Sequence, residues 1–400
     1  MHCFRKITDD LYWVGASDRR IELFENIFPL SDGVSYNSYL LLDDKTVLFD
    51  SADYSVGRQF LENVQAALNG RSLDYLIVNH MEPDHCAMID ELVLRYPDMQ
   101  IIGNAKTFPM IDQFFNFNLE GKKVIVKEGD TFCTGKHTLH FVMAPMVHWP
   151  EVMMTYDETD KILFCADAFG TFKALNGNIF NDEVNFDRDW LDEARRYYTN
   201  IVGKYGMQVQ AVLKKAAGLD IQMLCPLHGP IWRTDLDYII GKYDKWSRYE
   251  PEEKGVMIAY ASMYGNTENM AEILAAKLAE AGVKDIRMHN ISKTHVSELI
   301  ADSFKYSHIV LAAPTYNNGI YPLMDNYLED MKALALKNRT IAVLGNGSWA
   351  PQSTKLISTK ISEMKDMSLM VAAVTIKSSV KKAQMEEIES LARQIAEEVL

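Results

Sequence analysis

Short apolar runs alternate with polar turns through the first 250 residues. Residues 36–42 and 46–50 are two such runs, and the polar turn 43–45 between them is typical of a β-hairpin. Residues 56–68 carry apolar side chains at helical spacing, and Asn69-Gly70 predicts the end of that helix. Further strands are expected at 73–78, 100–103, 123–126, 138–144, 153–156, 161–166 and 221–225. Further helices are expected at 87–96, 189–217 (with a break at Gly203 or Gly206) and 236–246. The pattern indicates a mixed-sheet α/β sandwich.

The alternation is interrupted by a charged segment, bounded by proline and glycine, at residues 248–255. Such a segment predicts a linker, and hence two domains at 1–250 and 255–400. Strands are expected after it at 255–261, 285–290, 307–313, 339–345 and 368–376. Helices are expected between and after them at 267–281, 296–302, 321–336, 351–365 and 381–399. Five strands interleaved with helices predict a doubly wound parallel sheet of flavodoxin-like order.

Composition narrows the class of protein. The 400 residues carry a net charge of −14 with a pI near 5.2, which argues against nucleic acid and against an anionic membrane surface as partners. The longest apolar runs have the length of strands, and the first residues lack a secretory pattern, so we expect a cytoplasmic protein. The five cysteines show no CxxC spacing, which argues against disulfides and iron–sulfur sites.

Potential metal ligands are concentrated directly after the expected strand at 73–78. Four of them fall within six residues: His80, Glu82, Asp84 and His85. Three more each follow a later expected strand: His148, Asp167 and His228. Because α/β sheets hold their sites at the carboxyl ends of strands, we expect all seven to converge on one sheet edge. A single histidine of this kind is more often structural, whereas the shared placement favours metal ligands.

The number and type of these ligands indicate which metal the site would take. Seven ligands suit two ions better than one, and a carboxylate such as Asp167 can bridge two metals about 3.5–4 Å apart. Nitrogen and oxygen ligands without a thiolate suit iron or manganese at least as well as zinc.

Three loops in the second half follow expected strands and suit a mononucleotide. The first opens a helix and contains Ser262, Met263, Tyr264, Gly265, Asn266 and Thr267. The second contains Pro314, Thr315, Tyr316, Asn317, Asn318 and Gly319, and the third Asn346, Gly347, Ser348 and Trp349. No lysine or arginine lies between 262 and 269, so a P-loop for ATP or GTP is disfavoured. A helix N-terminus can hold a phosphate, and Tyr316 and Trp349 could pack on an isoalloxazine ring. FMN is therefore the expected cofactor, although each loop alone could be an ordinary turn.

The spacing His-x-Glu-x-Asp-His, followed by His148, Asp167 and His228, resembles the flavodiiron protein family. The resemblance extends over nearly the whole chain and implies a metallo-β-lactamase-like αββα sandwich followed by a flavodoxin-like domain. Hydrolases of that sandwich fold usually have histidine at the position of Glu82, so the carboxylate favours the iron-binding branch. By resemblance, one iron would be held by His80, Glu82 and His148. The other would be held by Asp84, His85 and His228, with Asp167 as the bridge, although the family does not always use a ligand at the position of His85.

The resemblance also implies an activity. Electrons would pass from FMN to a non-haem diiron centre that reduces O2 to water, NO to N2O, or both, and Tyr197 (or its neighbour Tyr198) would supply a proton or hydrogen bond. The electron donor would be a separate rubredoxin-like protein or a reduced cofactor. The assembly would be a head-to-tail homodimer, or a dimer of such dimers. Two alternatives remain open: a dizinc hydrolase fused to a flavodoxin domain, and a non-catalytic electron carrier.

Overall fold

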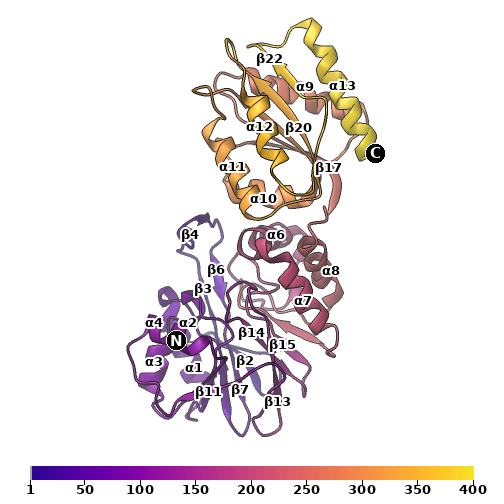
Figure 1. Cartoon of the computed structure of the whole chain (residues 1–400). Helices are drawn as coiled ribbons and strands as arrows, with labels where there is room; N and C mark the ends of the chain where they lie inside the picture. The colour runs from indigo at the N-terminus through magenta and orange to yellow at the C-terminus, as the bar shows by residue number, and fades with distance from the viewer. Residues whose placement is uncertain (1) are drawn as a thin grey trace. The chain divides into compact units, whose positions relative to one another are not determined.

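The computed structural model describes residues 2–400 and divides the chain into two compact units, Met1–Asp244 and Lys245–Leu400 (Figure 1). The boundary between the units falls within the last helix of the first one, a few residues before the expected linker. None of the helices in the described residues combines the length and the apolar character that crossing a membrane requires.

The first unit is built on two facing sheets. The larger has the order β1 (Arg5–Lys6), β2 (Leu11–Trp13), β7 (Tyr39–Leu42), β8 (Thr46–Phe49), β9 (Tyr75–Ile77), β10 (Gln100–Gly103) and β11 (Lys123–Ile125). The smaller has the order β12 (Thr131–Cys133), β13 (Thr138–Met143), β14 (Met153–Asp157), β15 (Ile162–Phe164) and β16 (Met223–Cys225). Both sheets mix parallel and antiparallel pairs. One core cluster contains residues of both sheets, and the rings of Phe49 and Phe164 stack across it with centroids 3.7 Å apart. The predicted α/β sandwich is thereby confirmed.

Helices and two small strand pairs complete this unit. The helices are α1 (Gly57–Leu68), α2 (Pro83–Cys86), α3 (Ile89–Arg95), α4 (Thr107–Phe114), α5 (Phe186–Asp189), α6 (Leu191–Tyr197), α7 (Gly206–Ala216) and α8 (Leu236–Ser247). Shorter turns are η1 (Tyr54–Val56), η2 (Asn181–Glu183), η3 (Tyr198–Val202) and η4 (Gly203–Tyr205). The small pairs are β3 (Ala16–Asp18) with β6 (Val34–Tyr36), and β4 (Leu23–Phe24) with β5 (Phe28–Pro29).

The structure adds detail to two helix predictions in this unit. The helix expected at 189–217 is divided at the expected glycines, since η4 begins at Gly203 and α7 at Gly206, and the π-helical turn η3 before them was not expected. The helix expected at 87–96 is α3, and a separate short helix, α2, precedes it, because Pro83 occupies the first helical position of α2, where its missing N–H costs nothing.

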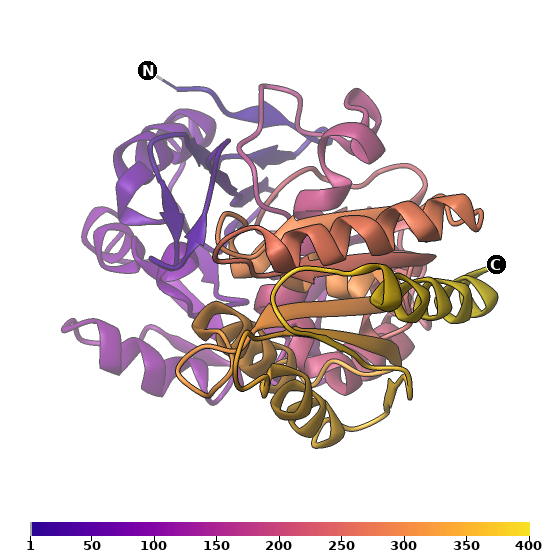
Figure 2. The ribbon, with the colours of Figure 1, turned by 90° about the horizontal axis from the view of Figure 1, so that it is seen from above.

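The second unit is a parallel sheet covered by helices on both faces. Its strands are β17 (Glu253–Tyr260), β18 (Ile286–Asn290), β19 (Tyr306–Pro314), β20 (Arg339–Asn346), β21 (Met367–Leu369) and β22 (Val374–Ile376). Its helices are α9 (Asn266–Glu280), α10 (Val296–Lys305), α11 (Pro322–Ala333), α12 (Ser353–Ser362) and α13 (Lys382–Val399). The order β18-β17-β19-β20-β21 is flavodoxin-like, as predicted. Helices α9 and α13 contact each other on one face, and α11 and α12 lie on the other (Figures 1 and 2).

The prediction of one continuous strand at 368–376, the last of this sheet, was wrong. It forms two short strands, β21 and β22, which both pair with β20. The chain turns outward between them at Val371, whose side chain is fully exposed. Apolar residues therefore continue through a stretch that leaves the sheet, which the hydrophobic pattern could not distinguish from one strand.

A buried histidine ties the first unit together away from its ligand loops. The Nδ1 atom of His137 lies 2.7 Å from an oxygen of Asp157, and Nε2 lies 3.1 Å from an oxygen of Asp10. Burial lowers the pKa of His137, but its hydrogen bonds to these two carboxylates outweigh burial and raise the pKa to about 9. Burial raises the pKa of Asp10, but hydrogen bonds from His137, Lys136 and Thr8 outweigh burial and lower it to about 2. The ammonium of Lys136 lies 2.9 Å from Asp10, so a lysine side chain contributes positive charge beside the carboxylate of Asp10.

The pKa of His137 predicts how stability depends on pH. A pKa raised on folding gives stability that is complete below the unfolded value near 6.5 and is lost as the pH rises through about 9. We expect the free energy of unfolding in urea to fall by about 1–2 kcal/mol between pH 6.5 and 9.5, and His137→Gln to remove most of this fall. His140→Gln is the control, because His140 pairs with the exposed Glu158. An equal pH dependence in wild type and His137→Gln would contradict the assignment.

Candidate metal centre and flavin pocket

The ligand loop 79–85 is held in place by a buried carboxylate. Asp50, directly after β8, accepts hydrogen bonds from the backbone N–H of Asn79 (2.7 Å) and His80 (3.1 Å) and from the Asn79 side chain (2.8 Å). Burial raises the pKa of Asp50 to about 6, and these donors oppose that effect. Asn79 in turn accepts from Met153 and Thr155 of the other sheet. The loop is therefore fixed to both sheets of the sandwich.

Strand register places the candidate ligands at one end of the sandwich. In the parallel pair of β15 and β16, Phe164 lies opposite Cys225. Asp167 and His228 each follow three residues later, so they emerge side by side. His80 follows the last residue of β9 at the same interval. All seven side chains are buried.

The seven residues form two groups, and Asp167 faces both. The first group is His80, Glu82, His148 and Asp167, and the second is Asp84, His85 and His228. Within each group the potential ligand atoms lie within 4.8 Å of one another. The Asp167 oxygen Oδ2 lies 3.2 Å from His80 Nε2 and 3.1 Å from His148 Nε2. The other oxygen, Oδ1, lies 3.1 Å from His85 Nε2. This is the arrangement of a carboxylate that bridges two sites.

The chemistry of the cluster fits two metal ions. Both oxygens of Asp84 and of Asp167 are buried without a hydrogen-bond partner in the described residues, which leaves their lone pairs for another electrophile. Burial opposes the charge of His80 and His148, but the surrounding carboxylates raise the pKa of both, that of His148 to about 9. Burial is likewise outweighed by histidines that lower the pKa of two carboxyls: His148 and His80 act on Glu82, and His85, His80 and His148 act on Asp167. When no metal ion is bound, protons on the histidine rings balance the negative charge of the carboxylates. Two bound metal ions would supply this positive charge instead.

Tyr197 borders the second ligand group. It ends α6 and is fully buried, and its ring centroid lies 5.3 Å from that of His228. Its hydroxyl has no hydrogen-bond partner in the described residues, and burial raises its pKa far above the usual value. Tyr198, the other candidate, packs instead against Tyr243, with ring centroids 4.8 Å apart.

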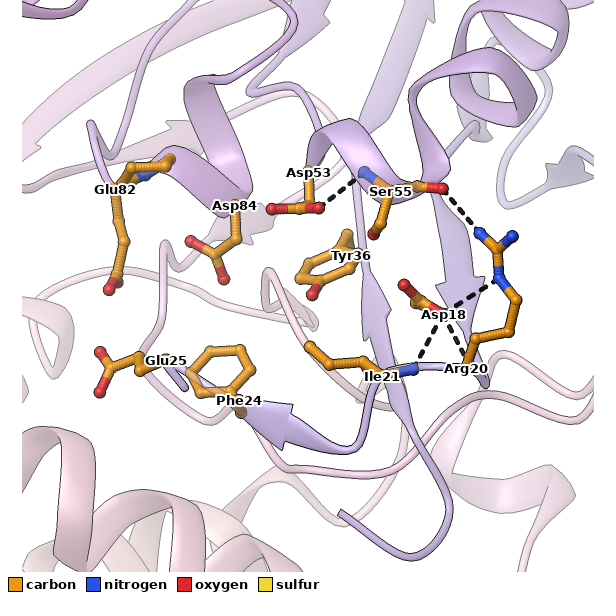
Figure 3. Close-up of a pocket in the computed structure, with 11 residues that line it drawn as sticks. Asp18, Arg20, Ile21, Phe24, Glu25, Tyr36, Asp53, Ser55, Glu82 and Asp84 are labelled. Atoms are coloured by element: carbon orange, nitrogen blue, oxygen red, sulfur yellow. Dashed lines mark hydrogen bonds and ion pairs between the residues drawn. The ribbon is translucent and has the colours of Figure 1, made fainter. Parts of the chain in front are cut away.

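A pocket of about 620 Å³ opens onto the cluster (Figure 3). Glu82 and Asp84 line it together with Asp18, Arg20, Ile21, Phe24, Glu25, Tyr36, Asp53, Ser55 and Pro83. The carboxylate of Glu25 points toward that of Glu82 across the pocket. Burial and the charge of Glu82 raise the pKa of Glu25 to about 8. Glu25 and Asn26 both have positive φ in the turn between β4 and β5. Sequence reasoning missed Glu25, because nothing in the pattern around it marks a site.

Hydrogen bonds orient the ligand histidines, and the residues that accept them were also missed. His80 Nδ1 lies 2.8 Å from a Glu151 oxygen, and His228 Nδ1 lies 2.7 Å from the Ser35 carbonyl. Glu151 follows His148 by three residues, and that proximity was the only signal in the sequence. Ser35 contributes only its backbone to this bond, so its residue type carried no signal.

In the second unit, the three expected loops line one pocket of about 340 Å³. Of the expected residues, those lining it are Ser262, Met263, Tyr264, Asn266, Thr267, Pro314, Thr315, Tyr316, Asn317, Asn318, Asn346, Gly347, Ser348 and Trp349. Gly265 and Gly319 do not line it. Gly265 is the N-cap of α9, and the N–H of Gly319 bonds the carbonyl of Tyr316. Ala350 and Ser378 complete the lining and were not predicted.

This pocket fits a flavin mononucleotide. The start of the 15-residue helix α9 would supply backbone N–H groups to the phosphate, and no lysine or arginine lies between residues 262 and 269. The rings of Tyr264 and Trp349 are 92% and 79% exposed at the pocket, where a planar ligand would cover them.

Comparison with known proteins matches each unit to a known family. Residues 34–229 match the model of the ODP family beta lactamase, and residues 258–398 match the flavodoxin model. An anaerobic nitric oxide reductase flavorubredoxin of Escherichia coli is 30% identical over 378 residues, which cover 92% of this chain and 77% of the relative. The structure is similar to rubredoxin oxygen:oxidoreductase of Desulfovibrio gigas, with a TM-score of 0.92, 27% identity and coverage of 99% and 98% of the two chains. The flavodiiron protein of Giardia intestinalis, 24% identical with a TM-score of 0.93 over 99% and 96%, shares the fold.

A beta-lactamase-like sandwich that presents a two-metal ligand set, followed by a flavodoxin domain, defines a flavin- and metal-dependent oxidoreductase. The chain belongs to the flavodiiron protein family. Its cofactors are FMN and a pair of non-haem irons, and the pocket and the ligand cluster described above fit them.

Proposed function

We propose that this protein reduces O2 to water, NO to N2O, or both, with electrons that enter through FMN. The observation that carries the proposal is the position of Asp167 between two ligand groups, one of which contains Glu82. The irons supply the redox chemistry when bound, and carboxylate ligands stabilise their higher oxidation states. The names of two relatives support one gas each, nitric oxide and oxygen, so both belong to the proposal.

We assign the ligands according to these groups. His80, Glu82 and His148 would hold one iron, Asp84, His85 and His228 would hold the other, and Asp167 would bridge the two. The role of His85 as a direct ligand is supported by its Nε2 atom, which lies 3.1 Å from both Asp167 Oδ1 and His228 Nε2. This Nε2 atom is therefore close enough to the other ligand atoms to bind the same ion.

The pocket beside Glu82 and Asp84 is the proposed access route for the gas. Ile21, Phe24 and Tyr36 give it an apolar side, which suits a small uncharged molecule. The hydroxyl of Tyr197, which has no hydrogen-bond partner in the described residues and whose ring lies beside His228, would donate a hydrogen bond to the bound gas.

Replacing Tyr197 tests its role. Tyr197→Phe removes only the hydroxyl, and we expect turnover to fall roughly tenfold to a hundredfold while the iron and FMN contents stay unchanged. Steady-state gas consumption and metal analysis provide the two readouts. Tyr198→Phe is the matched control, because its ring lies against Tyr243, and it should leave turnover intact. Unchanged turnover in Tyr197→Phe would remove the proposed hydrogen bond from the mechanism.

The function itself is tested by turnover on iron-replete, FMN-loaded protein. The flavin is reduced without air, O2 or NO is supplied in separate experiments, and the consumption of gas is followed over many turnovers beside a control with free FMN. We expect catalytic consumption of at least one gas, with water or N2O as the product. Zinc without iron in the purified protein would favour a hydrolase and overturn the proposal. A flavin that is reduced but supports no catalytic consumption of either gas would indicate an electron carrier.

We further propose a head-to-tail homodimer that receives electrons from a separate rubredoxin-like protein or reduced cofactor. Support comes from the family and from the rubredoxin in the name of the Desulfovibrio relative. Sedimentation across a dilution series, with turnover measured at each concentration, tests the dimer. A monomer with full turnover would contradict it.

A further inference from the structure

Glu151 is a buried anion that contacts a ligand histidine but does not reach the ligand cluster itself. Its side chain is 1% exposed, and Oε1 accepts hydrogen bonds from His80 Nδ1 and from the Met81 N–H, both at 2.8 Å. Its other oxygen has no partner in the described residues. Two hydrogen-bond donors on one oxygen stabilise the ionised form of this carboxylate.

The backbone of Glu151 is held by the loop that follows β10. The side chain of Asn104 donates a hydrogen bond of 2.5 Å to the Glu151 carbonyl. His148 lies three residues earlier in the same loop. Glu151 therefore ties the loop of one ligand, His148, to the ring of another, His80, and both belong to the same ligand group.

The bond to Glu151 also determines which nitrogen of His80 faces the cluster. Because Nδ1–H donates to the carboxylate, the lone pair of Nε2 points toward Glu82 and Asp167, at 3.3 Å and 3.2 Å. A carboxylate acceptor draws the Nδ1 proton and makes the imidazole a stronger electron donor than a neutral acceptor would.

The other ligand group lacks such a partner. His228 Nδ1 bonds only the neutral carbonyl of Ser35, and His85 Nδ1 has no partner in the described residues. Otherwise the groups are balanced, since each has one terminal carboxylate, Glu82 or Asp84, two histidines and a share in Asp167. Of the acceptors described here for the Nδ1 atoms of the ligand histidines, Glu151 is thus the one that carries a charge, and it serves the His80 group.

We propose that Glu151 is a positioning residue that makes the two iron sites unequal, so that the His80 side is the harder to reduce. This rests on the proposed function, because it presumes that the cluster holds two redox-active irons. A negative charge one imidazole away from the ion stabilises the higher oxidation state on that side. The half-reduced protein then has its ferric ion on the side of His80.

Glu151→Gln is the test, because glutamine keeps an acceptor for His80 Nδ1 and removes the charge. We expect the reduction equilibrium of one iron to shift about tenfold toward the ferrous form, which is about 59 mV for one electron, while the other iron moves less. Reductive titration of ⁵⁷Fe-loaded protein, followed by Mössbauer and EPR spectra of the half-reduced state, measures this. Glu151→Ala should weaken the binding of one iron about 10- to 100-fold and leave the other.

Glu158→Gln is the control for charge, since it removes a glutamate that is 65% exposed and should shift neither iron. A merely structural role for Glu151 would lower stability without changing the difference between the two irons, and equal shifts of both irons would also overturn the inference. If wild-type protein holds no redox-active iron, the proposed function fails first. If wild type titrates as two irons and Glu151→Gln leaves their separation unchanged, only the inference on Glu151 fails.

Discussion

Asp167→Asn is expected to lower turnover at least about a thousandfold and to reduce the bound iron below two per chain. Asp167 is the only residue whose two oxygens face both ligand groups among those described. Asparagine offers one oxygen and an NH2 group, and the NH2 would point donors at the space of one metal. The loss is therefore expected at one site first, with the second weakened because the bridge is gone.

The measurements for Asp167→Asn are iron per chain, FMN per chain and gas consumption. FMN content should stay unchanged, because the flavin pocket lies in the other compact unit. Asp220→Asn is the matched control, since Asp220 is an exposed aspartate paired with Lys161, and it should change none of the three. Two irons with full turnover in Asp167→Asn would show that the bridge is made by another group.

The ligand cluster could be predicted because each ligand follows its own strand closely. His80, Asp167 and His228 lie three residues beyond β9, β15 and β16, so a correct prediction of three strands was sufficient to bring them together. The FMN loops follow from the same logic, since β17, β19 and β20 are parallel and adjacent. Local hydrophobic pattern and the ends of parallel strands carry this information.

The residues that surround the cluster could not be predicted, because tertiary contacts rather than local pattern place them. Glu25 reaches Glu82 only because the turn between β4 and β5 has positive φ at two successive residues without glycine. Glu151 is identified by its bond to His80, which is 71 residues away in the chain. Ser378 enters the FMN pocket after β22, a strand that the pattern merged with β21. Each of these depends on where a loop turns, and side-chain type alone does not specify that.

Gly265→Val is expected to weaken FMN binding about 100-fold and to stop electron delivery to the irons, with the iron content unchanged. Gly265 has φ of +87°, a conformation that a β-branched residue adopts only at a cost of about 2 kcal/mol or more. No atom lies within 4 Å of an added Cβ, so this cost is conformational and not steric. To relieve it, the chain must leave the geometry in which Gly265 caps α9 and its N–H bonds Ser262, and the phosphate loses its N–H donors.

Gly282→Val separates the loss of FMN from a general loss of stability. Gly282 has φ of +102° just after α9 ends, and its nearest neighbour to an added Cβ is a Leu400 methyl at 3.7 Å. The two variants therefore impose similar backbone strain next to opposite ends of the same helix. Thermal unfolding should show comparable losses of stability, while the quenching of FMN fluorescence on binding should weaken only in Gly265→Val.

An FMN affinity equal to that of wild type in both variants would mean that the loop at 262–267 does not hold the phosphate. Equal loss in both would mean that FMN binding reports the stability of the whole unit rather than the geometry of one loop.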